Sequence, residues 1–135
     1  MSDFDYVSNI KELLTYFKSK HYPVVVLSNT CFSKKAIKEM LGELNKYIKD
    51  VIVSSEYVVR KPYKTFFDLG INKLNIKRPD IYYIGNDFYN DIYGATNANI
   101  YPIWFNEVHN KRLTDLNVDE YMEIDNYNQL IEMDF

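Results

Sequence analysis

The apolar residues near the start of the chain change from helical spacing to a continuous run. Helical spacing is kept by Val7, Ile10, Leu13, Leu14 and Phe17, which predicts a first helix. Pro23 then opens the run PVVVLS, which is short and β-branched, as in a strand buried on both faces. The first expected unit is therefore a helix followed by a strand of a parallel sheet.

The same alternation continues through the middle of the chain. Ser33 is a candidate N-cap for a second helix, whose apolar face would be Ile37, Met40, Leu41, Leu44 and Ile48. VIVSS, residues 51–55, predicts another short buried strand. Pro62 suits the first turn of a third helix, whose apolar residues would be Phe66, Phe67, Ile71 and Leu74.

The last part of the chain repeats the alternation with shorter elements. DIYYIG predicts a strand, residues 90–97 a short helix, and residues 100–105 a strand broken by Pro102. YMEI predicts a further strand, and residues 127–133 a closing helix. Helices alternating with strands at these lengths indicate an α/β fold: a three-layer α/β/α sandwich around a mostly parallel, doubly wound, Rossmann-like sheet.

Composition narrows the class of protein. With 135 residues, 47% of them hydrophobic, the chain can bury one core, so we expect a single domain over residues 1–135. A net charge of −3 with scattered basic residues argues against nucleic acid or a membrane surface as partner. No apolar run reaches the roughly 18 residues of a membrane span, and no secretory signal is recognisable, which predicts a cytoplasmic location. Cys31, the only cysteine, allows no disulfide framework.

The polar residues that follow the predicted strands are the candidate site. In parallel α/β sheets ligands bind beyond the carboxyl ends of the strands. Ser28 and Asn29 follow the first strand, and their hydroxyl and backbone N–H groups suit a phosphoryl oxygen, although on their own they are better explained by a plain strand-to-helix turn. Lys61 follows the second strand and could neutralise a phosphate or a carboxylate, or could simply be solvated.

The segment GNDFYND follows the third strand and is rich in oxygen ligands. Asp87 and Asp91, with Asn86 beside them, suit Mg²⁺ held through one or two carboxylates and water. The alternative is an Asx turn that caps the next helix, with Asp91 favoured by the helix dipole. The two interpretations are compatible.

Together, VVVLSNT, RKP and YYIGNDFYNDIYGA resemble motifs II to IV of the haloacid dehalogenase (HAD) superfamily of phosphohydrolases. The resemblance covers nearly the whole chain. It implies that Ser28 binds the phosphoryl group, that Lys61 and Asp91 belong to the catalytic centre, and that Mg²⁺ is held by the acids of GNDFYND, Asp87 and Asp91, with Asn86.

The chain departs from the family pattern in two places. Asn86 stands where the family's first motif-four aspartate would align, and an amide is a poorer Mg²⁺ ligand. Motif I, a strand that ends in Asp-x-Asp and supplies the nucleophile, is not found. Asp3 and Asp5 match its letters, but no strand precedes them, so we interpret SDFDYV as the lead-in to the first helix. We therefore expect a core domain that is incomplete at its N-terminus and has no cap domain.

The missing strand would lie between the strands that carry motifs II and IV, so either another segment fills the gap or the two edges close on each other.

The leading hypothesis is a phosphohydrolase core that acts on a phosphomonoester with weakly bound Mg²⁺, its nucleophilic Asp missing from this chain. An N-terminal segment or another subunit would supply motif I, or the chain would self-associate. The alternatives are an inactive HAD-like module that binds a phosphorylated ligand or a partner protein, and an unrelated flavodoxin-like binding domain.

Overall fold

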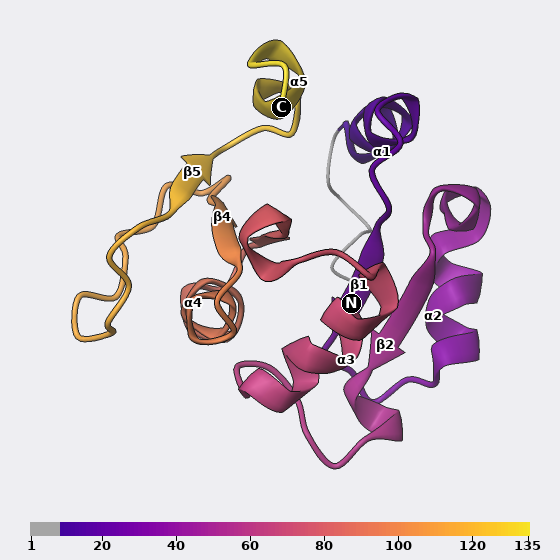
Figure 1. Ribbon diagram of the computed structural model, residues 1–135, viewed down its shortest axis with the longest axis horizontal. Coiled ribbons are helices and arrows are strands. Elements are labelled where there is room, and N and C mark those ends of the chain that lie inside the picture. Colours follow the sequence, from indigo (N-terminus) through magenta and orange to yellow (C-terminus); the bar gives the residue numbers. More distant parts are fainter. Residues whose placement is uncertain (1–8) are drawn as a thin grey trace.

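The strands form two separate parallel groups in the computed structural model, which describes residues 9–135 (Figure 1). β1 (Val25–Ser28) pairs with β2 (Asp50–Val53). The second group has the order β3 (Tyr82–Gly85), β4 (Tyr101–Phe105) and β5 (Met122–Ile124). Each paired strand runs parallel to its neighbour, as the alternation of helices and strands predicted.

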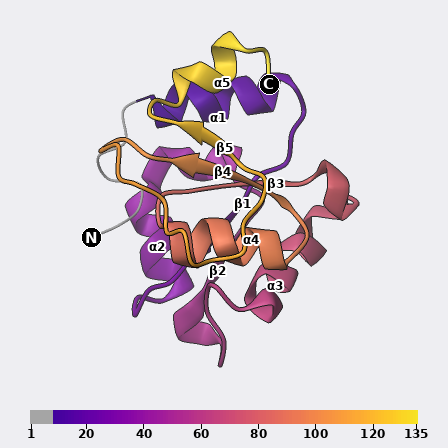
Figure 2. The same ribbon diagram turned by 90° about the vertical axis from the view of Figure 1, so that its left-hand side faces the viewer.

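Helices cover both faces of the strands (Figure 2). α1 (Ile10–Ser19), α2 (Lys34–Leu41) and α5 (Asn128–Glu132) cover one face, and α3 (Lys64–Leu74) and α4 (Gly94–Asn97) the other. This arrangement confirms the predicted α/β class with helices on both sides of parallel strands. Within residues 9–135, no helix is long and apolar enough to cross a bilayer.

β2 shows how a continuous apolar run serves two layers at once. Successive side chains of a strand point to opposite faces. Val51 and Val53 therefore pack in the cluster that holds Ile37 of α2, whereas Ile52 packs in the cluster that holds Phe66 of α3. Ser33 caps α2 as predicted, because its hydroxyl accepts a hydrogen bond of 3.1 Å from the Ala36 N–H.

Two predicted helix boundaries are wrong. α2 stops at Leu41 because Gly42 adopts a positive φ of 55°, and a 3₁₀ turn (Gly42–Tyr47) follows. Met40 is exposed and was wrongly assigned to the apolar face, whereas Leu44 and Ile48 pack against the cluster of Ile37 although they lie beyond α2. α3 begins at Lys64, two residues after Pro62.

The third strand is followed by a π-helical turn (Phe88–Tyr93) that continues directly into α4, where a single short helix was predicted. The predicted break at Pro102 is also wrong, because β4 is continuous. Pro102 lies opposite Tyr83 of β3, one residue before the pairing of β4 with β5 begins at Ile103. Val7, which was assigned to the first helix, lies outside the described residues.

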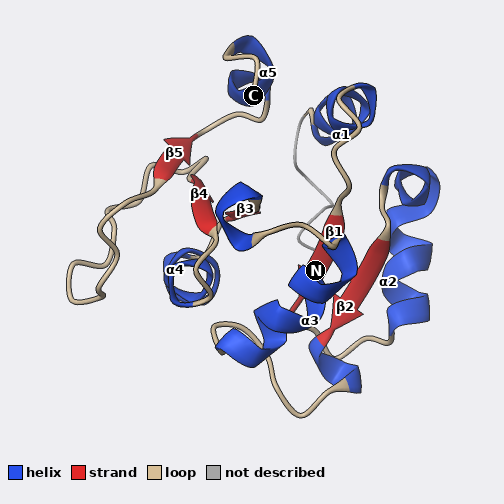
Figure 3. Ribbon diagram, in the orientation of Figure 1, coloured by secondary structure: helices blue, strands red, loops and turns tan. Residues whose placement is uncertain are grey.

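The two strand groups do not pair with each other in residues 9–135, and a gap separates β1 from β3 (Figure 3). We call this gap the seam. A cavity of about 820 Å³ lies in it, and most of its lining is apolar: Leu13, Phe17, Leu27, Phe67 and Ile84 are among the lining residues. The alternative in which the two edges close on each other is therefore wrong for the described residues.

Phe135 bridges the seam at the end where β1 and β3 begin. Its ring packs against Phe17 of α1, against Tyr22, which precedes β1, and against Tyr82 of β3, with centroid distances of 6.1, 6.5 and 4.7 Å. The Tyr22 hydroxyl also donates to the Phe135 carbonyl oxygen (3.0 Å). Hydrogen bonds from Lys20 and Tyr16 hold the pKa of neighbouring Asp134 below its usual value.

Removing this bridge should destabilise the fold. Phe135→Ala deletes a half-buried ring that contacts both sides of the seam, so we expect the free energy of unfolding to fall by roughly 1–2 kcal/mol. Urea unfolding followed by circular dichroism measures this change. Met133→Ala is the matched control, because Met133 is 50% exposed, and it should change stability by less than about 0.5 kcal/mol. Equal effects of the two substitutions would contradict the bridging role.

Candidate functional site

Lys61 and Asp91 form a buried ion pair at the end of the seam where β1 and β3 finish. The Lys61 ammonium donates to Asp91 Oδ1 over 2.7 Å, and the two side chains are only 6% and 4% exposed. A charge this deeply buried is costly unless it is paired, so each of these side chains requires the other. Two residues that the sequence predicted separately are thus brought into direct contact.

Asn29 fixes the backbone of Lys61. The Asn29 amide nitrogen donates to the Lys61 carbonyl oxygen (3.1 Å), and the Lys61 N–H donates back to Asn29 Oδ1 (2.8 Å). Asn29 directly follows β1, so this reciprocal pair attaches the loop that carries Lys61 to the carboxyl end of that strand. The amide that was predicted as a phosphate ligand therefore also has a structural role.

Asp91 is held from its own side by the turn that follows β3. Asp91 lies within the π-helical turn, and its Oδ2 accepts a hydrogen bond from the Asp87 N–H (3.0 Å). Asp87 caps the same turn, since its Oδ1 accepts from the Asn90 N–H (2.9 Å). A Cβ on Gly85 would lie 2.4 Å from the Cβ and Cγ of Asp91, so only glycine permits this close approach.

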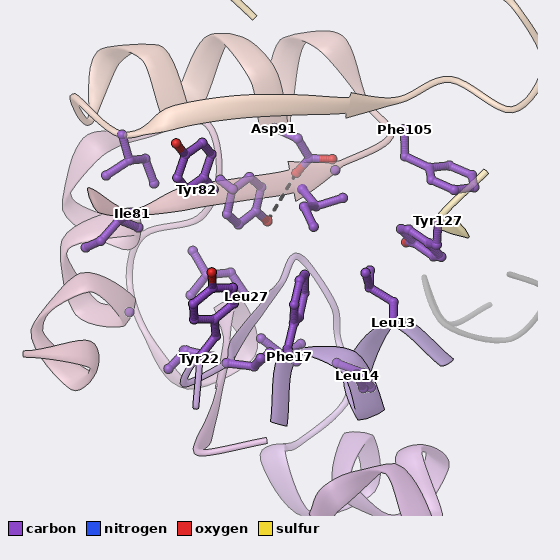
Figure 4. A pocket seen from close by; sticks show the side chains of 18 of the residues that line it. Leu13, Leu14, Phe17, Tyr22, Leu27, Ile81, Tyr82, Asp91, Phe105 and Tyr127 are labelled. Carbon is purple, nitrogen blue, oxygen red and sulfur yellow. Dashed lines mark hydrogen bonds between the residues drawn. The ribbon is translucent and has the colours of Figure 1, made fainter. Parts of the chain in front are cut away.

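Tyr83 belongs to the site although the sequence reasoning missed it. Its hydroxyl donates to Asp91 Oδ1 over 3.4 Å, and the Lys61 ammonium lies 5.8 Å from the centre of its ring. Figure 4 shows Asp91 at one side of the cavity, where this hydrogen bond joins it to Tyr83. Apolar side chains such as Phe17 and Leu27 lie across the cavity from it. A clue was available, because Tyr83 lies two residues before Gly85 in the strand.

The remaining predicted residues lie near the pair in different environments. Ser28 is buried at the end of β1, whereas Asn86 and Asp87 are exposed. Lys61, Asp91 and Asn86 line the cavity. The Thr30 N–H donates to Ser54 Oγ (2.9 Å) and the Ser54 hydroxyl donates to the Thr30 carbonyl oxygen (3.2 Å), which ties the ends of β1 and β2 together. Cys31 is exposed.

The turn after β3 provides part of a Mg²⁺ shell. Asp87 and Asn86 offer exposed oxygen atoms of the hard type that Mg²⁺ prefers, and Asp91 lies below them. Both Asp91 oxygens already accept hydrogen bonds, one of them from Lys61. No group of three or more His, Cys, Asp or Glu side chains comes together within residues 9–135. These donors fit a hexacoordinate ion only when water, a phosphate or a further carboxylate completes the shell.

This combination defines a class: a parallel α/β protein with a buried lysine–aspartate pair and oxygen ligands at the carboxyl ends of its strands. The family model for haloacid dehalogenase-like hydrolases matches residues 2–105. The chain belongs to this family.

Proteins with assigned activities are among its relatives. The glyceraldehyde 3-phosphate phosphatase of Pyrococcus furiosus is 27% identical over 129 residues, which cover 94% of this chain and 53% of the relative. The corresponding phosphatase of Methanothermobacter thermautotrophicus is 31% identical over 98 residues, which cover 73% of this chain and 43% of the relative. The chain spans about half the length of the curated relatives it matches.

Solved structures share the fold. A HAD phosphatase from Thermococcus onnurineus superimposes with a TM-score of 0.80 at 19% identity, covering 96% of this chain and 58% of that one. An uncharacterised protein from Listeria monocytogenes superimposes with a TM-score of 0.76 at 28% identity, covering 93% of this chain and 77% of that one. The Rossmann-like HAD fold predicted from the three motifs is thereby confirmed.

Breaking the buried pair should cost far more than changing its exposed neighbour. Asp91→Asn removes the carboxylate that faces the buried Lys61 ammonium over 2.7 Å, so we expect a loss of about 3 kcal/mol in the free energy of unfolding. Asp87→Asn is the same substitution four residues away on an exposed cap where asparagine serves equally well, and it should change stability by less than about 0.5 kcal/mol. Urea unfolding measures the free energy of unfolding of both variants. Similar losses would show that the buried pair contributes no more to stability than the exposed cap does.

Proposed function

We propose that this chain contributes one part of a HAD-type phosphohydrolase centre, which acts on a phosphomonoester with Mg²⁺. The observation that carries the proposal is the buried Lys61–Asp91 pair at the carboxyl ends of parallel strands, facing an open cavity. A fixed ammonium in a poorly solvated site stabilises phosphoryl charge much better than a solvated lysine does. Membership of a hydrolase family and the phosphatase relatives support the same reaction class.

Each predicted residue has a role in this proposal. Lys61 neutralises charge on the phosphoryl group and on an attacking carboxylate, while Asp91 keeps the ammonium in place. Ser28 and Asn29, at the end of β1, offer hydroxyl and backbone N–H groups to phosphoryl oxygens. Asp87, Asn86 and Asp91 would hold Mg²⁺, weakly in this chain alone, and the ion would supply further positive charge at the phosphoryl group.

The nucleophile would be a carboxylate from outside residues 9–135. A carboxylate that attacks phosphorus forms an acyl phosphate, which water then hydrolyses, so the reaction needs an acid that is free to attack. Asp91 is unsuited, because both its oxygens accept hydrogen bonds inside its own turn and from Lys61. Asp3 and Asp5 lie outside the described residues, and their interpretation as a lead-in segment stays a prediction.

The seam is where an additional strand would deliver that carboxylate. β1 and β3 run in the same direction along the seam. Tyr22, just before β1, and Tyr82, at the start of β3, both contact Phe135 at one end. Asn29, just after β1, and Asp91, in the turn after β3, both contact Lys61 at the other end. Their facing edges pair with no strand among the described residues. An apolar strand parallel to both would pair with these edges, fill the cavity and finish beside Lys61. An N-terminal segment or another subunit would provide it.

The substrate to test first follows from the relatives. Three curated relatives are named for glyceraldehyde 3-phosphate, a small phosphomonoester, so we propose a compound of this class. The alternative is an inactive module that binds a phosphorylated ligand or a partner protein. It is favoured by Asn86, which offers an amide where the family pattern has a carboxylate, and by the complete use of the Asp91 oxygens.

Supplying the strand in trans tests the proposal. We expect the purified chain to show no Mg²⁺-dependent release of phosphate from glyceraldehyde 3-phosphate or an aryl phosphate, because the attacking carboxylate is lacking. A synthetic peptide of five β-branched residues followed by Asp should bind the seam and restore turnover. The matched peptide that ends in Asn should bind without turnover, and one with a central Pro should not bind. Amide NMR shifts in β1 and β3 report binding, and phosphate release reports turnover.

The other outcomes distinguish the competing explanations. Binding of both peptides without any turnover favours the inactive module. Sedimentation tests for dimers. If dimers form and dissociate when the Asp or Asn peptide is added, the chain self-associates through the facing edges of β1 and β3. Turnover by the chain alone, abolished by Asp3→Asn or Asp5→Asn, would contradict an external nucleophile.

A further inference from the structure

The turn that carries Asp91 has a second, apolar face directed away from Lys61. Phe88 and Ile92 are 6% and 0% exposed and pack in a cluster with Trp104 of β4 and with Val118. The turn is therefore held from two sides: the polar side by the ion pair, and the apolar side by this cluster. We call the cluster, together with Tyr121, which packs against it, the aromatic box.

Trp104 connects the aromatic box directly to the backbone of the candidate ligands. Its indole N–H donates to the Asn86 carbonyl oxygen over 3.0 Å, and its ring packs edge-on against Phe88, with centroids 4.9 Å apart. Asn86 and Phe88 flank Asp87, whose own N–H donates to Asp91 Oδ2. A movement of the box would therefore move the peptide units on both sides of Asp87.

Arg112 closes the aromatic box from the segment that joins β4 to β5, residues 106–121. The carbon at the centre of its guanidinium group lies 5.1 Å from the centre of the Phe88 ring and 5.5 Å from that of Tyr121. Its two terminal nitrogens donate to the carbonyl oxygens of Val118 (3.0 Å) and Leu116 (3.3 Å). Only a planar group with several donors can contact two rings and bridge two carbonyls at once.

These contacts separate two possible roles for Arg112. The hydrogen bonds to Leu116 and Val118 remain within its own segment and would serve only to fold that segment. The contact with Phe88 reaches the turn itself, one residue from Asp87 and two from Asn86. Cation–π contacts strengthen when they are partly shielded from water, and Arg112 is partly buried.

We infer that Arg112 is a positioning residue for the candidate metal-binding turn. Through Phe88 and Trp104, it fixes where the Asn86 and Asp87 backbone lies relative to the Lys61–Asp91 pair. The segment between β4 and β5 is in this account a support for the site. The functional meaning rests on the proposed function, whereas the structural coupling can be measured without Mg²⁺ or substrate.

The single tryptophan of the chain makes this coupling measurable. Trp104 gives one indole N–H resonance, and its hydrogen bond ends on Asn86, so its hydrogen exchange reports on the turn directly. For Arg112→Leu, we expect indole exchange about tenfold faster than in the wild type, together with shifted amide resonances over residues 86–91. Amide resonances in β1, β2 and α2 should stay unchanged.

Two further variants keep the test decisive. Arg112→Lys retains the charge and should fold, but it loses the planar group, so we expect most of the same acceleration at the Trp104 indole. Lys111→Leu removes an exposed neighbouring charge and should leave the indole and the turn as in the wild type. Wild-type indole exchange and unshifted turn amides in Arg112→Lys would overturn the inference, even with a lowered thermal midpoint, because Arg112 would then support only its own segment.

Discussion

The buried ion pair between Lys61 and Asp91 is the constraint on which the arrangement of the site depends. Two opposite charges that are each nearly excluded from water stay in contact, because separating them would cost far more free energy than separating an exposed pair. The pair therefore fixes the loop after β2 against the turn after β3, across a seam where no strand pairing joins the two groups in residues 9–135. Phe135 bridges the opposite end, so side-chain contacts span both ends of the cavity.

The local patterns of the sequence predicted the elements well. Short β-branched runs gave β1 and β2, the apolar segment DIYYIG gave β3, and Ser33 caps the helix that it was expected to cap. The parallel architecture followed from the alternation of helix and strand, and the site from the polar residues at the strand ends. The failures are equally local. The positive φ of Gly42 shortened α2, and Pro102 was tolerated because its part of β4 precedes the pairing with β5.

Contacts between distant segments could not be predicted in this way. From the sequence alone, Tyr83 is only a strand residue and Arg112 only a charged residue in a loop. The fold brings the Tyr83 hydroxyl to Asp91 and packs the guanidinium group of Arg112 against Phe88. The same holds for Asn29, which was predicted from its place after a strand but whose bond to the Lys61 backbone spans 32 positions. Motif order indicated which residues converge, and only the fold gave their contacts.

A double-mutant cycle on Lys61 and Asp91 tests the central claim most directly. The cycle compares the free energies of unfolding of the wild type, Lys61→Met, Asp91→Asn and the double variant, and it isolates the energy that depends on both side chains. We expect a coupling energy of about 2 kcal/mol, with the double variant more stable than the sum of the single losses predicts, because the loss of the pair is then counted only once. Additive losses, within about 0.3 kcal/mol, would contradict the account that this pair organises the site.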